Sequence, residues 1–184
     1  MSEFRFTDGN LIVLYARFTP ENNEIPSHIQ QRIKTCTDTY SMIANSKPDG
    51  NKTMVVIVSS TETADRVKQA LIQGGVDQKI IASDTDSNNM SEAVSHIYSI
   101  IESKPNPPFI YFVASYWMQD IFTSTVVSKL KGFRVQFYGA IDQRTVATIE
   151  ADKAAETPRK GTEYYKQKAK NKAVDVLLNV IFPD

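Results

Sequence analysis

The sequence contains few of the residues that build covalent, metal or membrane sites. Its single cysteine, Cys36, cannot form a disulfide within the chain, and two histidines, His28 and His96, are too few for a zinc site of the Cys/His type. No run of eighteen apolar residues occurs, and the first residues show no basic stretch followed by a long apolar one. We therefore expect a cytoplasmic protein with no metal site and no membrane insertion.

An excess of charge of one sign is also missing. The 21 Lys and Arg residues balance 21 Asp and Glu residues, so no net field attracts the chain to nucleic acid or to an anionic membrane. A chain of 184 residues is long enough for one domain with a real hydrophobic core. We expect a single domain with a small-molecule ligand and no nucleic-acid partner, while the sequence leaves the oligomeric state open.

Apolar segments of strand length alternate along the chain with segments of helical period. This alternation predicts a parallel sheet flanked by helices, because helical crossovers connect parallel strands. The predicted fold is α/β, a three-layer sandwich around a doubly wound, Rossmann-like sheet of about five parallel strands. The last strand alternates polar and apolar residues, as expected at a sheet edge. The predicted strands are 11–16, 53–59, 79–83, 108–115 and 133–139.

The residues after the fifth predicted strand follow a looser pattern. Charged and small side chains at 140–160 indicate an excursion from the domain or a lid. Apolar residues at helical spacing over 161–182 predict a C-terminal helix. Both segments are included in one domain that spans the chain.

Glycine is scarce where nucleotide-binding folds require it. A phosphate-binding turn after the first strand needs glycine so that the backbone can approach a pyrophosphate, but Tyr15, Ala16 and Arg17 occupy this place. Neither a P-loop nor a G-x-S-x-G motif occurs in the sequence. NAD binding and ATP hydrolysis are therefore disfavoured.

Polar residues that follow the predicted strands are the candidate ligand contacts, because doubly wound sheets bind ligands beyond the carboxyl ends of their strands. Ser59, Ser60 and Thr61 either cap the next helix or hold an anion together with its backbone N–H groups. Asp84 and Asp86, which follow the third strand, are either solvated acids or ligands for a hydroxyl-rich molecule or a hard cation.

Other candidates also have a structural and a functional interpretation, and for each of them the structural one is favoured. Asn89 and Glu92 fit a helix capping box, which explains both without a ligand. Arg32, in the first predicted helix, either faces solvent or reaches a phosphate or carboxylate at the sheet edge. The lone residues His28 and His96 are expected at the surface or in caps. Aromatic residues after the fourth strand either join the core or stack on a flat ligand ring; they are Tyr116 and Trp117, followed by Met118.

The order and character of these segments resemble the YdcF/SanA/ElyC family of α/β proteins, a group best known from bacterial envelope contexts. The resemblance covers roughly residues 10 to 145 and rests on LIVLYAR, EIPSHIQQRIKTCTDTY, VVIVSSTETADRVKQALIQGGVDQKIIASDTDSNNMSEAV, IYFVASYWMQDIF and FRVQFYG. It implies a nucleotide-like ligand such as S-adenosylmethionine, and it links any reaction to envelope or glycan precursors. The positions that match polar motif residues of the family are Arg32, Ser59, Glu62, Asp84, Asn89, Glu92 and Ser115.

The chain departs from the family pattern in the turns that carry chemistry. Tyr15-Ala16-Arg17 replace a glycine triplet, Ser60 and Thr61 replace glycines of the second turn, and residues near Met118 and Ile121 replace a histidine and an arginine. Because methionine cannot transfer a proton, only Glu62 and Asp84 remain as candidate catalytic bases, and enzymatic activity stays open.

Two functional hypotheses follow. The first is a YdcF-like protein that binds a small polar, anionic or nucleotide-like ligand at the carboxyl ends of the strands. The second is a non-catalytic interaction module whose ligand pocket has degenerated. The ligand contacts predicted under the first hypothesis are Arg17, Arg32, Ser59, Ser60, Thr61, Glu62, Asp84, Asn89, Glu92 and Ser115.

Overall fold

The computed structural model describes residues 9–19, 24–46, 52–102 and 104–156. Within these residues the strands are β1 (Gly9–Tyr15), β2 (Lys52–Val58), β3 (Ile81–Asp84), β4 (Phe109–Ser115) and β5 (Val135–Ala140). The helices are α1 (Ser27–Ser46), α2 (Thr61–Gln73), α3 (Met90–Ile101), α4 (Gln119–Lys129) and α5 (Val146–Glu156), with short 3-10 turns η1 (Gln78–Ile80) and η2 (Tyr116–Met118).

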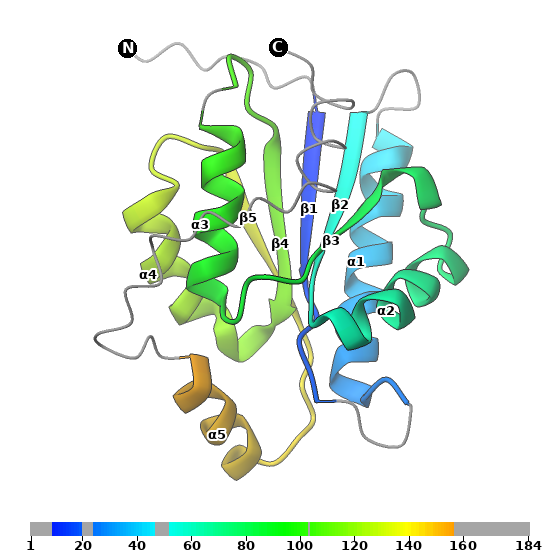
Figure 1. Cartoon of the computed structure of the whole chain (residues 1–184), viewed down its shortest axis with the longest axis vertical. Coiled ribbons are helices and arrows are strands. Elements are labelled where there is room, and N and C mark those ends of the chain that lie inside the picture. Colours follow the sequence, from blue (N-terminus) through cyan, green and yellow to red (C-terminus); the bar gives the residue numbers. More distant parts are fainter. Residues whose placement is uncertain (1–8, 20–23, 47–51, 103, 157–184) are drawn as a thin grey trace.

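The strands form one parallel sheet in the order β3-β2-β1-β4-β5, with helices on both faces (Figure 1). This confirms the predicted α/β sandwich with a Rossmann-like sheet. β5 lies at one edge, as its alternating sequence predicted. The chain runs from β1 outward to β2 and β3, then returns to β4 on the other side of β1, so the strand order reverses between β1 and β4.

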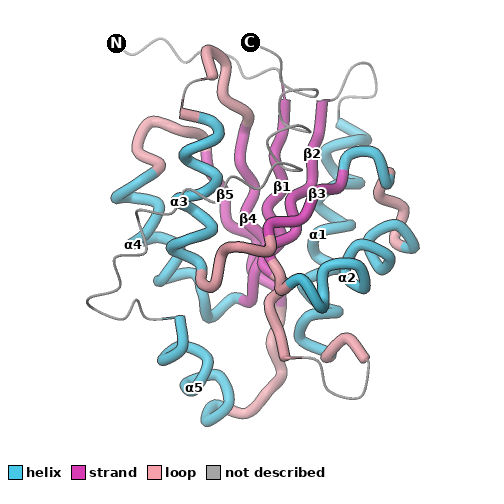
Figure 2. Tube along the Cα trace, in the orientation of Figure 1, coloured by secondary structure: helices cyan, strands magenta, loops and turns pink. Residues whose placement is uncertain are grey.

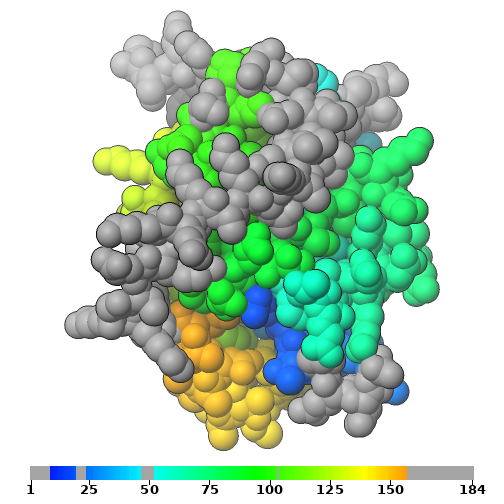
Figure 3. Space-filling model, in the orientation of Figure 1, coloured from blue at the N-terminus to red at the C-terminus, as the bar shows by residue number. Residues whose placement is uncertain are grey.

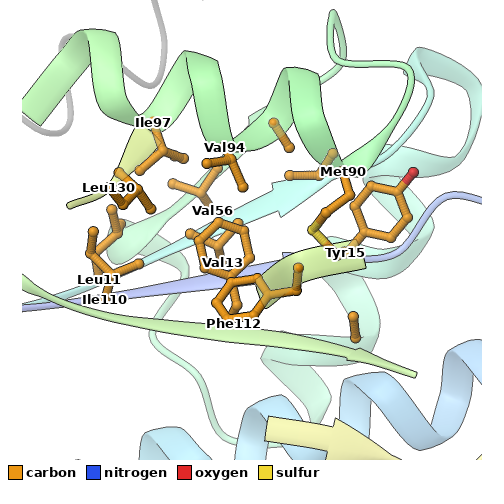
Figure 4. Close-up of a cluster of buried hydrophobic side chains, with 14 of the residues drawn as sticks. Leu11, Val13, Tyr15, Val56, Met90, Val94, Ile97, Ile110, Phe112 and Leu130 are labelled. Carbon is orange, nitrogen blue, oxygen red and sulfur yellow. The ribbon is translucent and has the colours of Figure 1, made fainter. Parts of the chain in front are cut away.

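Two hydrophobic clusters, one on each face, hold the layers together. Successive side chains of a strand point to opposite faces, so β1 contributes Leu11 and Val13 to the cluster under α3 and α4. Its alternate residues Ile12 and Leu14 join the cluster under α1 and α2. Because both faces are covered, β1 is apolar at nearly every position, as strands of buried parallel sheets are. Figure 4 shows the cluster on the α3 side.

Helix ends follow the glycine signals in the sequence. Gly75, just after α2, has a φ of +94°, and Gly132, just after α4, has a φ of +95°. Residues with a side chain rarely adopt this left-handed conformation, which explains why glycine occupies both of these positions.

The expected lid segment contains α5, which lies beyond the carboxyl ends of the strands (Figure 2). No residue of α5 is buried. The last residues of the expected lid, 157–160, and the predicted C-terminal helix over 161–182 lie outside the described residues. No helix within the described ranges is both long and apolar enough to cross a membrane.

We expect Phe112→Ala to lower the free energy of unfolding by about 3–5 kcal/mol, because Phe112 is fully buried in β4 and packs against Phe122 with ring centroids 4.9 Å apart. The control Val127→Ala, at a 69% exposed position of α4, should change it by less than about 0.5 kcal/mol. Urea denaturation measures both, and similar losses in the two variants would contradict the assignment of the core.

Candidate functional site

A cavity of about 590 Å³ lies beyond the carboxyl ends of β1 and β4, where the strand order reverses. This is the place where doubly wound sheets bind ligands, and the volume is typical of a small-molecule site. Figure 3 shows the segment containing α5 beside the residues that follow β1 at this end of the molecule. The walls come from β1, α1, η2, α5 and loops next to them, and include Tyr15, Arg17, His28, Arg32, Trp117 and Arg144.

Arg32 forms the inner wall and is only 2% exposed. Its Nε donates to Ser115 Oγ at 2.9 Å, and its Nη1 donates to the Tyr15 carbonyl at 3.0 Å. Among the described residues, no carboxylate forms an ion pair with Arg32. Burial lowers the pKa of its guanidinium to about 10, so the group is still charged at neutral pH. The cavity is therefore bordered by a buried cation whose charge is not directly neutralised within the described part of the chain.

Ser115 connects Arg32 to an acidic residue behind the wall. While its Oγ accepts from Arg32, it donates to Asp142 Oδ2 at 3.1 Å. Asp142 also accepts from Trp117 Nε1 at 3.0 Å, and Arg144 donates to both of its oxygens, from Nε at 2.9 Å and from Nη2 at 2.7 Å. Burial opposes ionisation of Asp142, but the bonds from Arg144 and Trp117 outweigh it and hold the pKa well below its ordinary value.

The charge of Arg144, unlike that of Arg32, is balanced by carboxylates that pair with it. In addition to Asp142, it pairs with Asp152 of α5 through Nη1 at 2.7 Å. These bonds raise the pKa of Arg144 against the effect of burial. Asp142 and Arg144 follow β5 directly and were not among the predicted contacts, although topology alone marks residues after any strand of the sheet as candidates.

Arg17 is the second cation of the cavity without a carboxylate partner among the described residues. It follows β1 and donates from Nη1 to the Ser87 carbonyl at 2.8 Å. Tyr15 and Arg17, which replace the glycines expected of a phosphate-binding turn, thus border the cavity without filling it.

His28, in the first turn of α1, is partly exposed and lines the same cavity. Burial lowers the pKa of its imidazole to about 4, and the nearby charges of Arg144 and Arg32 act in the same direction. The ring is therefore neutral at neutral pH and can either donate or accept a hydrogen bond.

Tyr15 and α5 meet in the wall of the cavity. Glu156, the last residue of α5, accepts a hydrogen bond from the Tyr15 hydroxyl and another from the Met90 backbone N–H at 2.9 Å. Figure 4 shows the Tyr15 ring beside Met90, with its hydroxyl pointing away from the hydrophobic side chains. Burial raises the pKa of Tyr15, and the neighbouring Glu156 raises it further.

Asp84 lies at the end of β3 and is fully buried, but it does not line the cavity. Its Oδ1 accepts from the backbone N–H groups of Asp86 and Ser87, and its Oδ2 accepts from Ser87 Oγ at 2.6 Å. His96 lies against the same carboxylate, with Nδ1 at 3.0 Å from Oδ2, so it is not a surface or capping residue. The geometry indicates a structural role for Asp84 in holding the loop before α3.

The Asp84 carboxyl is ionised more readily than usual. Burial acts to raise its pKa, but hydrogen bonds from His96 and Ser87 outweigh burial and lower it. A carboxylate with a lowered pKa and both oxygens occupied is a poor general base. The other candidate base, Glu62, is exposed in the first turn of α2 and does not line the cavity.

The remaining candidates lie at or next to helix termini, but only Asn89 and Glu92 make side-chain capping bonds. Asn89 caps α3, accepting from the Glu92 N–H at 2.9 Å, while Glu92 accepts from Asn89 Nδ2 at 3.0 Å. Ser60 is the residue at the amino end of α2, and buried Ser59 donates to its carbonyl at 3.1 Å. Thr61 begins the same helix and is exposed. The structure thus brings Arg17 and Arg32 to the cavity, with Ser115 behind Arg32, and leaves the other candidates outside its walls.

Acidic, histidine and cysteine side chains do not gather elsewhere into a metal site: the described ranges contain no cluster of three that could hold an ion. No protein-family model, curated protein or solved structure matches this chain. The resemblance to the YdcF/SanA/ElyC family accordingly stays a prediction.

We expect Asp84→Asn to lower the free energy of unfolding at neutral pH by about 2–4 kcal/mol, because the amide cannot replace the charged acceptor of a buried hydrogen-bonded group. Since the pKa of Asp84 is below 3.8 in the folded protein, this stabilisation is present above that pH and is lost as the pH falls through the folded-state pKa. The stability gap between wild type and variant should therefore narrow in acid.

Urea denaturation at neutral and acidic pH measures this gap. The control Asp38→Asn removes an exposed partner of Lys34 in α1 and should cost less than about 0.5 kcal/mol. A gap that stays constant on acidification would show that the carboxylate charge is not what stabilises the loop.

Proposed function

We propose that this protein binds a small anionic molecule, carrying a phosphate or carboxylate group, in the cavity beyond β1 and β4. The observation that carries the proposal is the environment of Arg32, a buried guanidinium that borders the cavity and has no carboxylate partner among the described residues. Removing a charge from water costs several kcal/mol unless an opposite charge compensates. An anionic ligand supplies this compensation.

The other walls support the same class of ligand. Arg17 adds a second cation, and guanidinium groups bind phosphate and carboxylate through paired N–H donors. Neutral His28 and the ring of Trp117 offer flat surfaces for the uncharged part of a ligand. The resemblance to YdcF-like proteins suggests a nucleotide-like molecule such as S-adenosylmethionine. Only the carboxylate of that molecule matches the cationic walls, because its ammonium and sulfonium groups make it a net cation. The link to envelope or glycan metabolism rests on the resemblance alone.

Glu62 and Asp84, the candidate bases, do not line the cavity, so no acid or base step is assigned to them. A protein-interaction module with a degenerate pocket is the function that remains if no anion binds.

Inorganic pyrophosphate is expected to bind the wild-type protein and to raise its Tm, since a ligand of the folded state stabilises by mass action. Arg32→Gln and Arg17→Gln should each weaken binding about 10- to 100-fold, the loss expected for one charge-assisted hydrogen bond. Titration calorimetry measures the affinity. The control is Arg134→Gln, which removes an arginine just before β5, at the amino ends of the parallel strands and so at the end of the sheet away from the cavity, and should leave the affinity unchanged.

Arg32→Gln also removes bonds to Ser115 and Tyr15, so its fold must be checked by circular dichroism. Arg17→Gln tests the same cavity through a partly exposed side chain and does not depend on that core contact. Unchanged affinity in folded Arg17→Gln and Arg32→Gln would overturn the proposal. So would a wild-type protein that binds none of pyrophosphate, AMP, citrate and S-adenosylmethionine.

Anion binding should also be linked to protonation of His28. A bound anion favours the imidazolium form, so it raises the pKa of His28 from about 4 and proton uptake accompanies binding. Affinity for sulfate, whose own charge is constant in this range, should therefore increase as the pH falls from about 7.5 to about 5. The charges that act on His28 are those of Arg144, Arg32, Asp142 and Asp152.

Calorimetric titrations with sulfate across this pH range test the linkage. His28→Gln keeps a hydrogen-bonding side chain without the titration and should flatten the pH dependence. An equally steep dependence in His28→Gln would assign it to another group and contradict the role of His28.

A further inference from the structure

The α5 helix borders the cavity without burying any side chain. Its partly buried residues recur at helical spacing on one face, and two of them, Asp152 and Glu156, make its polar contacts with the cavity wall. Asp152 pairs with Arg144, which belongs to the segment just before α5. Glu156 alone, among these contacts, ties the far end of the helix to the carboxyl end of β1 and to α3.

The Glu156 carboxylate lies among hydrogen-bond donors and positive charges that favour an anion. One oxygen accepts from the Tyr15 hydroxyl, and the other accepts from the backbone N–H of Met90, the first residue of the twelve-residue helix α3. A helix N-terminus favours negative charge. Independently of the helix, the charges of Arg32 and Arg17 act on this carboxylate, and Arg32 is a cation that is 2% exposed at the cavity wall.

The Glu156 carboxylate is not fully stabilised in this position. Burial raises its pKa, and the hydrogen bonds from Tyr15 and Met90 with the two arginine charges offset this effect only in part. Neither Arg17 nor Arg32 forms an ion pair with Glu156 or with any other carboxylate in the described residues. A phosphate has more acceptor oxygens and a larger charge than a carboxylate, so it can satisfy Tyr15, Met90 and the guanidinium groups together.

We infer that Glu156 is a built-in competitor, and that its carboxylate occupies an anion subsite, formed by Tyr15, the Met90 N–H, Arg17 and Arg32, from which a ligand phosphate or carboxylate displaces it. Displacement removes the contact that ties the end of α5 to the strands, so binding releases this end of the helix. The inference rests on the proposed function, because it assigns the charged group of the same ligand to a particular place.

Competition of this kind weakens the apparent affinity for the ligand. A tethered group has an effective concentration on the order of millimolar. The apparent dissociation constant of the ligand equals its intrinsic value divided by the fraction of protein molecules in which Glu156 has left the subsite. Removing the competing charge is therefore expected to strengthen anion binding, which is the opposite of what the loss of an ordinary ligand contact does.

The test compares pyrophosphate binding by wild type, Glu156→Gln and Glu156→Ala in calorimetric titrations. Both variants are expected to bind about tenfold more tightly than wild type, because a neutral or absent side chain competes less for the subsite. The matched control is Glu150→Gln, which makes the same change of charge on α5 at an exposed position paired with Lys153, and should bind as wild type does. Hydrogen exchange of 146–156 should also become faster when wild type is saturated with pyrophosphate.

The outcomes separate this inference from the proposed function. If Glu156→Gln and Glu156→Ala bind pyrophosphate no more tightly than wild type while Arg17→Gln still loses affinity, the competitor role is wrong and the anion site stands. If wild type, Glu156→Gln and Glu156→Ala all fail to bind, both proposals are overturned. If Glu156→Gln and Glu150→Gln raise the affinity for pyrophosphate equally, the effect comes from the change in net charge, and the inference is overturned.

Discussion

Arg32 donates one hydrogen bond to the last residue of β1 and another to the last residue of β4. A single guanidinium from α1 thus links the carboxyl ends of the two strands between which the strand order reverses. The Arg32 guanidinium stays charged although it is buried, because its pKa of about 10 is far above neutral pH. The relay through Ser115 to Asp142 offsets the charge only at a distance. The shape and the electrostatics of the cavity both depend on this arrangement.

The polar residues at the carboxyl edge divide into two kinds by how fully the protein satisfies them. Asp84 uses both oxygens within its own loop and on His96, and Asn89 and Glu92 complete each other's hydrogen bonds. Such groups stabilise the fold and have little left to offer a ligand. Arg17 and Arg32 carry charges that no described carboxylate pairs with, which is the condition under which a bound anion is most favourable.

The cationic cavity at the carboxyl ends of the strands forms without a glycine-rich turn after β1. Tyr15 places its ring in the core and donates its hydroxyl hydrogen to the Glu156 carboxylate of α5, which also lines the cavity. Since α5 buries no side chain, the contacts that hold it within the described part of the chain are mainly polar, and such contacts can exchange partners more easily than a packed hydrophobic face. The cavity is thus closed on one side by an element whose attachment is itself electrostatic.

Much of the architecture could be predicted from the sequence because it depends on local patterns. Strand-length apolar runs such as 11–16, helical spacing of Ile29 and Ile33, and glycine after each of α2 and α4 carry their structural meaning within a few residues. The capping box of Asn89 and Glu92 is equally local, and it was found from spacing alone. Parallel strands also fixed which end of the sheet would hold the polar loops.

The site itself was only partly predictable, because burial and pairing join residues far apart in the chain. Nothing near Arg32 in the sequence shows that it lies against Ser115, or that Arg144 takes the acids while Arg32 does not. The contact of Tyr15 with Glu156 spans 141 positions. The sequence by itself determined the elements and their order through short-range periodicity, and only the tertiary structure decided which charges are compensated, because compensation depends on distances that folding alone creates.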